Sequence, residues 1–200
     1  MLVTCREMSR AEEALFSTGV SAEPYMDEAG RQCAEAIRQF RPTPGRAEIF
    51  CGKGNNGGDA LVVARWLKRW GWSVEVHWCG GEKSLSPLGE KKRAEFEAEP
   101  MLDLPASRRS NRLIVVDGLL GIGASGDLRG EINAFAERIN HLREAAFATC
   151  FAIDIPTGLN ADTGEPYRGA VKADVTLSIT APKLGFAADR SVNFVGRLVE

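Results

Sequence analysis

Short runs rich in β-branched and aromatic residues alternate with longer amphipathic runs along this chain. The short runs cover residues 47–51, 73–79, 112–117 and 150–155, and the longer ones include 61–71 and 132–140. Such alternation is typical of strands joined by crossover helices, because parallel strands need long connections. We therefore expect an α/β fold with a largely parallel sheet covered by helices on both faces.

The two ends of the chain extend this pattern. Apolar residues at three- and four-residue steps predict a core-facing helix before the break at residues 41–45, and they are Met26, Ala29, Cys33, Ile37 and Phe40. Residues 175–180 and 193–200 are two more candidate strands, whereas the polar residues 81–110 give no assignment. We expect one domain over residues 1–200, cut from or fused to a longer chain after residue 200.

Composition excludes several classes of protein. A net charge of -2 without basic blocks argues against nucleic acid as a partner. No run approaches the roughly 18 apolar residues of a membrane span, and the first residues lack the pattern of a signal peptide, so we expect a cytoplasmic protein. The five cysteines form no C-x-x-C pair and there are two histidines, which argues against a zinc site or a disulfide framework.

Glycine-rich or polar loops follow three of the predicted strands. They are residues 52–59, residues 117–130 and residues 154–164. Parallel sheets bind ligands at the carboxyl ends of their strands, and free amides at a following helix start attract phosphate oxygens. One such loop is more often a simple turn, but three at one edge of a sheet favour a ligand site.

The first loop satisfies the G-x-G-x-x-G spacing of a dinucleotide fingerprint at residues 52–57, yet it is a poor match to a dehydrogenase. Asn55, Asn56 and Asp59 place polar side chains where the backbone should approach the pyrophosphate. The strand at residues 73–79 also lacks a terminal acidic residue for the ribose, since Glu75 lies in its middle. No G-K-[ST] sequence follows, so Lys53 is not a phosphate-loop lysine.

Asn56, Asp117 and Thr157 come from the three different loops and could form an all-oxygen cluster. Hard oxygens with a single carboxylate suit a monovalent cation such as potassium. The alternative is that each side chain only stabilises its own turn.

Three charged residues are candidates for chemistry. Asp154 ends a nearly apolar strand, so we expect it at the rim of the pocket as a general acid or base. Asp59 could complement the amino end of a helix or contact a ligand. Lys183 could reach the pocket, although a solvated lysine is the default expectation.

Three segments in this order and spacing resemble the hallmark blocks of the YjeF amino-terminal domain family, the NAD(P)H-hydrate epimerases. They are "CGKGNNGGDALVVARWL", "VVDGLLGIGASGDLRG" and "AIDIPTGLNADTGEPYRGAVKADVTLSITAPKLGF", and the helical residues 6–37 fit too. The chain departs from the usual family residues at Lys53, Ala60, Ile122, Thr157 and Asn160. At Thr157 the family usually has Ser, so the hydroxyl is kept.

The resemblance implies a Rossmann-like three-layer α/β/α sandwich, commonly dimeric, that interconverts the R and S forms of NADHX and NADPHX so that a dehydratase can repair them. It implies K+ held by Asn56, Asp117 and Thr157, and we expect Asp154 to transfer the proton. The implied substrate contacts are Asn55, Asn56, Gly57, Gly58, Asp59, Gly121, Ile122, Gly123, Ala124, Ser125, Gly126, Asp127 and Asp154.

Two other functions stay open at this point. The first is a non-catalytic nucleotide-binding or protein-interaction scaffold of the same fold, which the intact Asp117 and Asp154 argue against. The second is a redox enzyme using ordinary NAD, which the missing acidic residue disfavours. The preference between NADHX and NADPHX is also open, because Arg129 could meet a 2′-phosphate or lie on the surface.

Overall fold

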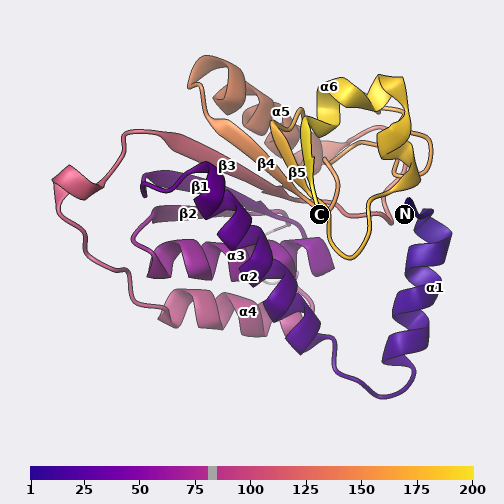
Figure 1. Cartoon of the computed structure of the whole chain (residues 1–200), viewed down its shortest axis with the longest axis horizontal. Helices are drawn as coiled ribbons and strands as arrows, with labels where there is room; N and C mark the ends of the chain where they lie inside the picture. The colour runs from indigo at the N-terminus through magenta and orange to yellow at the C-terminus, as the bar shows by residue number, and fades with distance from the viewer. Residues whose placement is uncertain (81–84) are drawn as a thin grey trace.

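A parallel sheet forms the centre of the molecule. The computed structural model describes residues 1–80 and 85–200, and in them the strand order is β2-β1-β3-β4-β5-β6, with every neighbouring pair parallel. The strands are β1 Arg46–Cys51, β2 Ser73–Trp78, β3 Leu113–Gly118, β4 Thr149–Ile153, β5 Val175–Leu177 and β6 Arg197–Val199. The predicted α/β class with a parallel sheet is confirmed (Figure 1).

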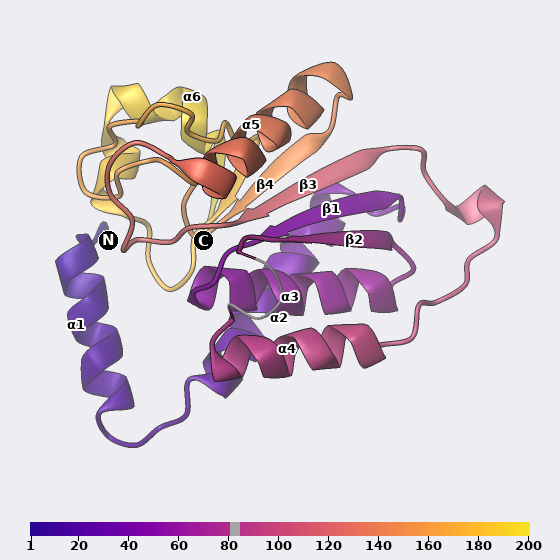
Figure 2. The same ribbon diagram turned by 180° about the vertical axis from the view of Figure 1, so that it is seen from behind.

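Helices cover both faces of this sheet. On one face lie α2 (Glu23–Phe40), α3 (Asn55–Arg69) and α4 (Pro87–Ala98), and on the other lies α5 (Gly130–Ala145) (Figures 1 and 2). α3 packs between α2 and α4. Fully buried side chains fill the core on each face, because the central strands have apolar residues on both sides. The three-layer sandwich is therefore confirmed.

The helix α1 (Cys5–Phe16) stands beside the sheet instead of on either face (Figures 1 and 2). It begins with a capping box, in which the Thr4 side chain and the Glu7 side chain each bind the other residue's backbone N–H. Val3 pairs with Lys183 just before the helix starts, and the Cys5 N–H donates to Asp162 at 2.6 Å. These contacts anchor α1 to loops that follow the later strands.

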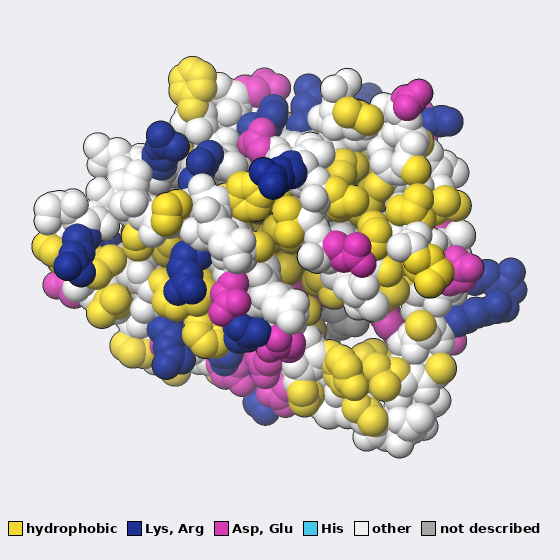
Figure 3. All heavy atoms as spheres, in the orientation of Figure 1, with side chains coloured by type: hydrophobic (Ala, Val, Ile, Leu, Met, Phe, Trp, Pro, Cys, Tyr) yellow, Lys and Arg dark blue, Asp and Glu magenta, His cyan; other side chains and the backbone are white. Residues whose placement is uncertain are grey.

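The helix predicted around residues 26–40 is confirmed as α2, with Met26, Cys33 and Ile37 buried. The polar region 81–110 also contains a helix, α4, which the sequence pattern did not reveal; residues 81–84 lie outside the described residues. An ion pair joins α4 to α2: the Nζ of Lys92, buried at 1% exposure, donates to Asp27 at 2.8 Å. Figure 3 shows acidic and basic side chains gathered side by side on this part of the surface.

The last predicted strands are shorter in the structure than in the sequence pattern. β5 ends at Leu177, and residues 193–200 divide into the one-turn helix α6 (Val192–Val195) and β6. Gly196 separates these two with φ of 59°, a left-handed conformation that glycine adopts without strain. Three 3₁₀ turns complete the described elements: η2 (Ala106–Arg108), η3 (Leu184–Ala187) and η4 (Asp189–Ser191). No helix within residues 1–80 and 85–200 has the length and apolarity of a membrane span.

Candidate functional site

The strand order reverses between β1 and β3, and the candidate site lies at this point. β1 leads through α3 to β2 on one side, whereas β3 leads through α5 to β4 on the other. In open parallel sheets such a reversal leaves a crevice beyond the carboxyl ends of the strands. A cavity of about 720 Å³ occupies it, and the predicted site residues among its lining are Asn55, Asn56, Asp59, Gly121, Ile122, Gly123, Ala124 and Asp154.

The other residues expected to contact substrate lie outside the cavity lining. Gly57 and Gly58 are buried within α3. Ser125, Gly126 and Asp127 are in the loop beyond the lining, where the Asp127 carboxylate accepts the Arg168 N–H at 3.2 Å. The cavity therefore brings together the first half of the second loop and the start of α3.

Two of the three glycines in the fingerprint spacing are required by backbone packing. A Cβ at Gly52 would lie 1.8 Å from the Leu119 carbonyl oxygen, and a Cβ at Gly57 would lie 2.0 Å from the Gly52 oxygen. Gly54 has no atom within 4 Å of the corresponding position. Gly52 thus permits close contact with the loop after β3, and Gly57 permits the first turn of α3 to pack against the start of its own loop.

Asp117 and Thr157 lie outside the cavity lining and contact each other. The Thr157 hydroxyl donates to Asp117 Oδ1 at 2.7 Å and the Thr157 N–H donates to Oδ2 at 2.8 Å. Asp117 is completely buried, and burial raises its pKa to about 6 despite the hydrogen bonds from Thr157 and the Leu119 N–H, which lower it. A buried carboxylate with neutral donors around it is a position that a cation would stabilise.

Asn56 completes this group through the loop after β3. Its Nδ2 donates to the Leu120 carbonyl at 2.9 Å, and the Leu120 N–H donates to the Thr157 hydroxyl at 3.1 Å. The Asn56 Oδ1 is buried and has no hydrogen-bond partner among the described residues. Buried polar oxygens are nearly always satisfied, so this oxygen fits the predicted potassium site. Nowhere in residues 1–80 and 85–200 do three or more His, Cys, Asp or Glu side chains form a metal-binding group.

Asp154 lies at the cavity directly after β4. Its φ of 64° is left-handed, an uncommon and strained conformation for a residue with a side chain. Its Oδ1 accepts the Ile179 N–H at 3.1 Å and also the ammonium of Lys183. The default expectation that Lys183 is solvated is wrong: the side chain is 0% exposed, because the chain after β5 folds over it.

Two further carboxyl groups face the same cavity. Asp59 lies in the second turn of α3, so the interpretation that it complements the first turn of a helix is wrong. Burial chiefly, and then the charges of Asp154 and Glu12, raise the pKa of Asp59 well above its usual range. Burial and the charge of Asp154 also raise the pKa of Glu12, while Lys183 opposes the shift. The pKa values of both carboxyl groups beside Asp154 are therefore raised.

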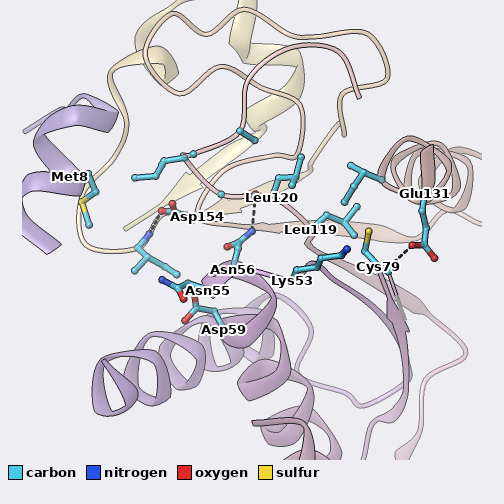
Figure 4. A pocket seen from close by; sticks show the side chains of 18 of the residues that line it. Met8, Lys53, Asn55, Asn56, Asp59, Cys79, Leu119, Leu120, Glu131 and Asp154 are labelled. Atoms are coloured by element: carbon cyan, nitrogen blue, oxygen red, sulfur yellow. Dashed lines mark hydrogen bonds between the residues drawn. The ribbon is translucent and has the colours of Figure 1, made fainter. Parts of the chain in front are cut away.

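Figure 4 shows how these side chains are distributed. Met8 and Asp154 lie on one side of the cavity, Cys79 and Glu131 lie on the other, and Asn56 and Lys53 lie between them. The cavity is consequently elongated, with carboxyl groups at both sides.

Sequence reasoning missed several lining residues, among them Met8, Glu12 and Glu131. Met8 and Glu12 are four residues apart and so share one face of α1, a signal that could have been read. Glu131 had no such signal: its carboxylate accepts the N–H of Gly80, 51 residues earlier in the chain. Glu131 thus places an acidic group beside the end of β2, and β2 has no acidic residue of its own at that end.

The fold and site define an α/β domain with a ligand cavity at the switch point of a parallel sheet. The sequence profile of the family described as YjeF-related protein N-terminus matches residues 22–185. The chain belongs to this family, and the resemblance noted in its sequence is confirmed.

Individual relatives extend this result. An NAD(P)H-hydrate epimerase of Rhodopirellula baltica is 39% identical over 184 residues, which cover 86% of this chain and 71% of that protein. An NAD(P)H-hydrate epimerase of Limosilactobacillus fermentum is 28% identical, with 98% and 94% covered. The bifunctional NAD(P)H-hydrate repair enzyme Nnr of Coxiella burnetii is 32% identical, and the chain spans 39% of its length.

A solved structure supports the fold. The crystal structure of yeast ynu0 superposes with a TM-score of 0.78 and 21% identity, covering 92% of this chain and 82% of the yeast chain.

Proposed function

We propose that this chain is an NAD(P)H-hydrate epimerase that interconverts the R and S forms of NADHX and NADPHX. Two relatives that carry this name are matched over 71% and 94% of their length. The observation that carries the proposal is the position of Asp154 after β4, in the lining of a cavity that the loops after β1 and β3 also line. We also propose that residues 1–200 form one domain of this type.

The chemistry suits these residues. The substrate carries a hydroxyl at C6, beside the ring nitrogen, so inversion can proceed by loss of that hydroxyl to a conjugated iminium and addition of water to the other face. This requires a proton donor and a proton acceptor but no redox partner. Asp154 is our candidate for proton transfer, and Asp59 and Glu12 are carboxyl groups available to hold the second proton because their pKa values are raised.

We propose that the substrate nucleotide lies along the two loops. Residues 55–59 and 121–127 together with Asp154 are the expected contacts, and the backbone amides at the start of α3 are suited to phosphate oxygens. Bifunctional relatives such as the Coxiella burnetii protein support functional coupling to a dehydratase. A homodimer is also expected from the family, and analytical ultracentrifugation would measure it.

We propose that Asn56, Asp117 and Thr157 hold a potassium ion. The unpartnered Asn56 oxygen and the single buried carboxylate support this donor set. When bound, the ion would supply positive charge that stabilises the Asp117 carboxylate. The three residues would thereby keep their loops in one arrangement around the cavity.

Thermal unfolding tests potassium binding at this site in the absence of substrate. At ten times its dissociation constant, potassium should stabilise the protein by about 1.4 kcal/mol and raise Tm by about 3–5 °C relative to choline chloride of equal ionic strength. Thr157→Val should remove the potassium-specific shift. The matched control is Thr176→Val, which removes another buried hydroxyl, one that donates to Val195 O at 2.7 Å, and should keep the shift. Equal Tm values in the two salts would contradict the potassium site.

The activity itself is tested with an R/S mixture of NADHX and a dehydratase specific for the S form. We expect this chain to speed the consumption of the R fraction above its spontaneous rate. If the folded protein gives no acceleration but NADHX raises its Tm, the non-catalytic binding module replaces the epimerase as the function.

A further inference from the structure

Lys183 is a completely buried lysine whose hydrogen-bonding capacity is fully used. Its Nζ donates to the Asp154 carboxylate, to the Ile179 carbonyl at 3.0 Å and to the Ala181 carbonyl at 2.9 Å. An ammonium has three donors, so none remains for a ligand. Removing a charge from water is costly unless it is paired. The side chain therefore acts on Asp154 and not on a substrate.

The two oxygens of Asp154 differ in their surroundings. Oδ1 accepts the hydrogen bonds from Lys183 and from the Ile179 N–H, whereas no described residue donates to Oδ2. The Asp154 side chain is 14% exposed and lines the cavity. One oxygen is thus held by protein, and the other is available to a bound molecule.

The backbone has a positive φ at Asp154 itself and at Thr180, three residues before Lys183. Asp154 and Thr180 have φ of 64° and 65°, and for a β-branched residue such as threonine this is a true outlier. Strain of this kind persists where surrounding contacts determine it, and it is common at functional sites. Here the hydrogen bonds from Val3 N to Pro182 O at 3.0 Å and from Leu184 N to Val3 O at 2.8 Å fix the segment that carries Lys183.

We infer that Lys183 is a positioning residue for the epimerase reaction: its ammonium holds Oδ1 of Asp154 so that Oδ2 points to the substrate. This rests on the proposed function, because it assigns Asp154 the proton transfer. Lys183 fixes the orientation of the Asp154 carboxylate through this hydrogen bond. The other titratable groups that face Asp154 are Glu12 on α1, Cys33 on α2 and Asp59 on α3.

Lys183→Gln removes the charge while it keeps a polar side chain. We expect kcat for NADHX epimerisation to fall by about tenfold to a hundredfold while KM changes less than about threefold, because Lys183 does not contact the substrate. The matched control is Lys172→Gln, with a lysine side chain that is 45% exposed, which should keep the wild-type kcat and KM.

Each outcome decides between roles. A wild-type kcat in folded Lys183→Gln, or a loss that appears in KM with kcat unchanged, would overturn the positioning role. If Lys183→Gln does not fold, Lys183→Arg carries the test: it keeps the charge on a longer side chain, so kcat should fall at unchanged KM, and a wild-type kcat would overturn the inference. Absence of activity in the wild-type protein would instead contradict the proposed function itself.

Discussion

Replacing Asp154 with Asn is expected to lower kcat for epimerisation by about 10²- to 10⁴-fold, because the amide cannot accept and return a proton. The coupled assay with the S-specific dehydratase measures this directly. Asp103→Asn is the control, since the Asp103 side chain is 97% exposed and lies away from the cavity.

The stability of this variant must be measured alongside its rate. Asp154→Asn leaves the buried Lys183 without its counter-charge, and breaking a buried pair in this way is commonly strongly destabilising. The epimerase assay must therefore be run at a temperature below the melting transition of Asp154→Asn. A folded Asp154→Asn protein with the full epimerase rate would show that another group transfers the proton.

Gly52→Ala is expected to destabilise the protein by at least about 4 kcal/mol, lowering Tm by about 8–16 °C. The added Cβ would lie 1.8 Å from the Leu119 carbonyl oxygen, a backbone atom that cannot rotate away. Thermal or urea unfolding measures the loss. The reason is the close packing between the loops after β1 and β3, which also shapes the cavity.

Gly54→Ala is the matched control for that substitution. It makes the same change two residues later, at a position with no atom within 4 Å of the added Cβ, and should alter stability by less than about 0.5 kcal/mol. If the two variants unfold alike, Gly52 is not required for contact between these loops.

Local patterns predicted most of the fold. The three central strands β1, β3 and β4 are largely buried runs of five or six residues, and burial on both faces is why such runs appear in a parallel sheet. α4 escaped detection because its docking depends on Lys92 and its acidic partners, which look like a solvated surface in the sequence. β6 was read too long because Gly196 turns the chain between two short elements.

The candidate site was predictable where its residues directly follow strands. Asn56, Asp117, Asp154 and Thr157 were singled out in this way, since the carboxyl ends of parallel strands lie at one edge of a sheet, and their roles remain predictions. Glu12 and Glu131 were not, because α1 and α5 bring them to the cavity from parts of the chain without a motif.

The sequence by itself therefore determined the parallel α/β class, the family and the loops that meet at the cavity, because these depend on residue patterns within short segments. Only the tertiary structure decided the environment of each charge. In the sequence, Lys183 is a lysine in a polar turn. In the structure, the segment after β5 buries it and its ammonium pairs with Asp154, 29 residues earlier. Burial and pairing depend on contacts between distant segments, and burial raises the pKa values of Asp59, Glu12 and Asp117.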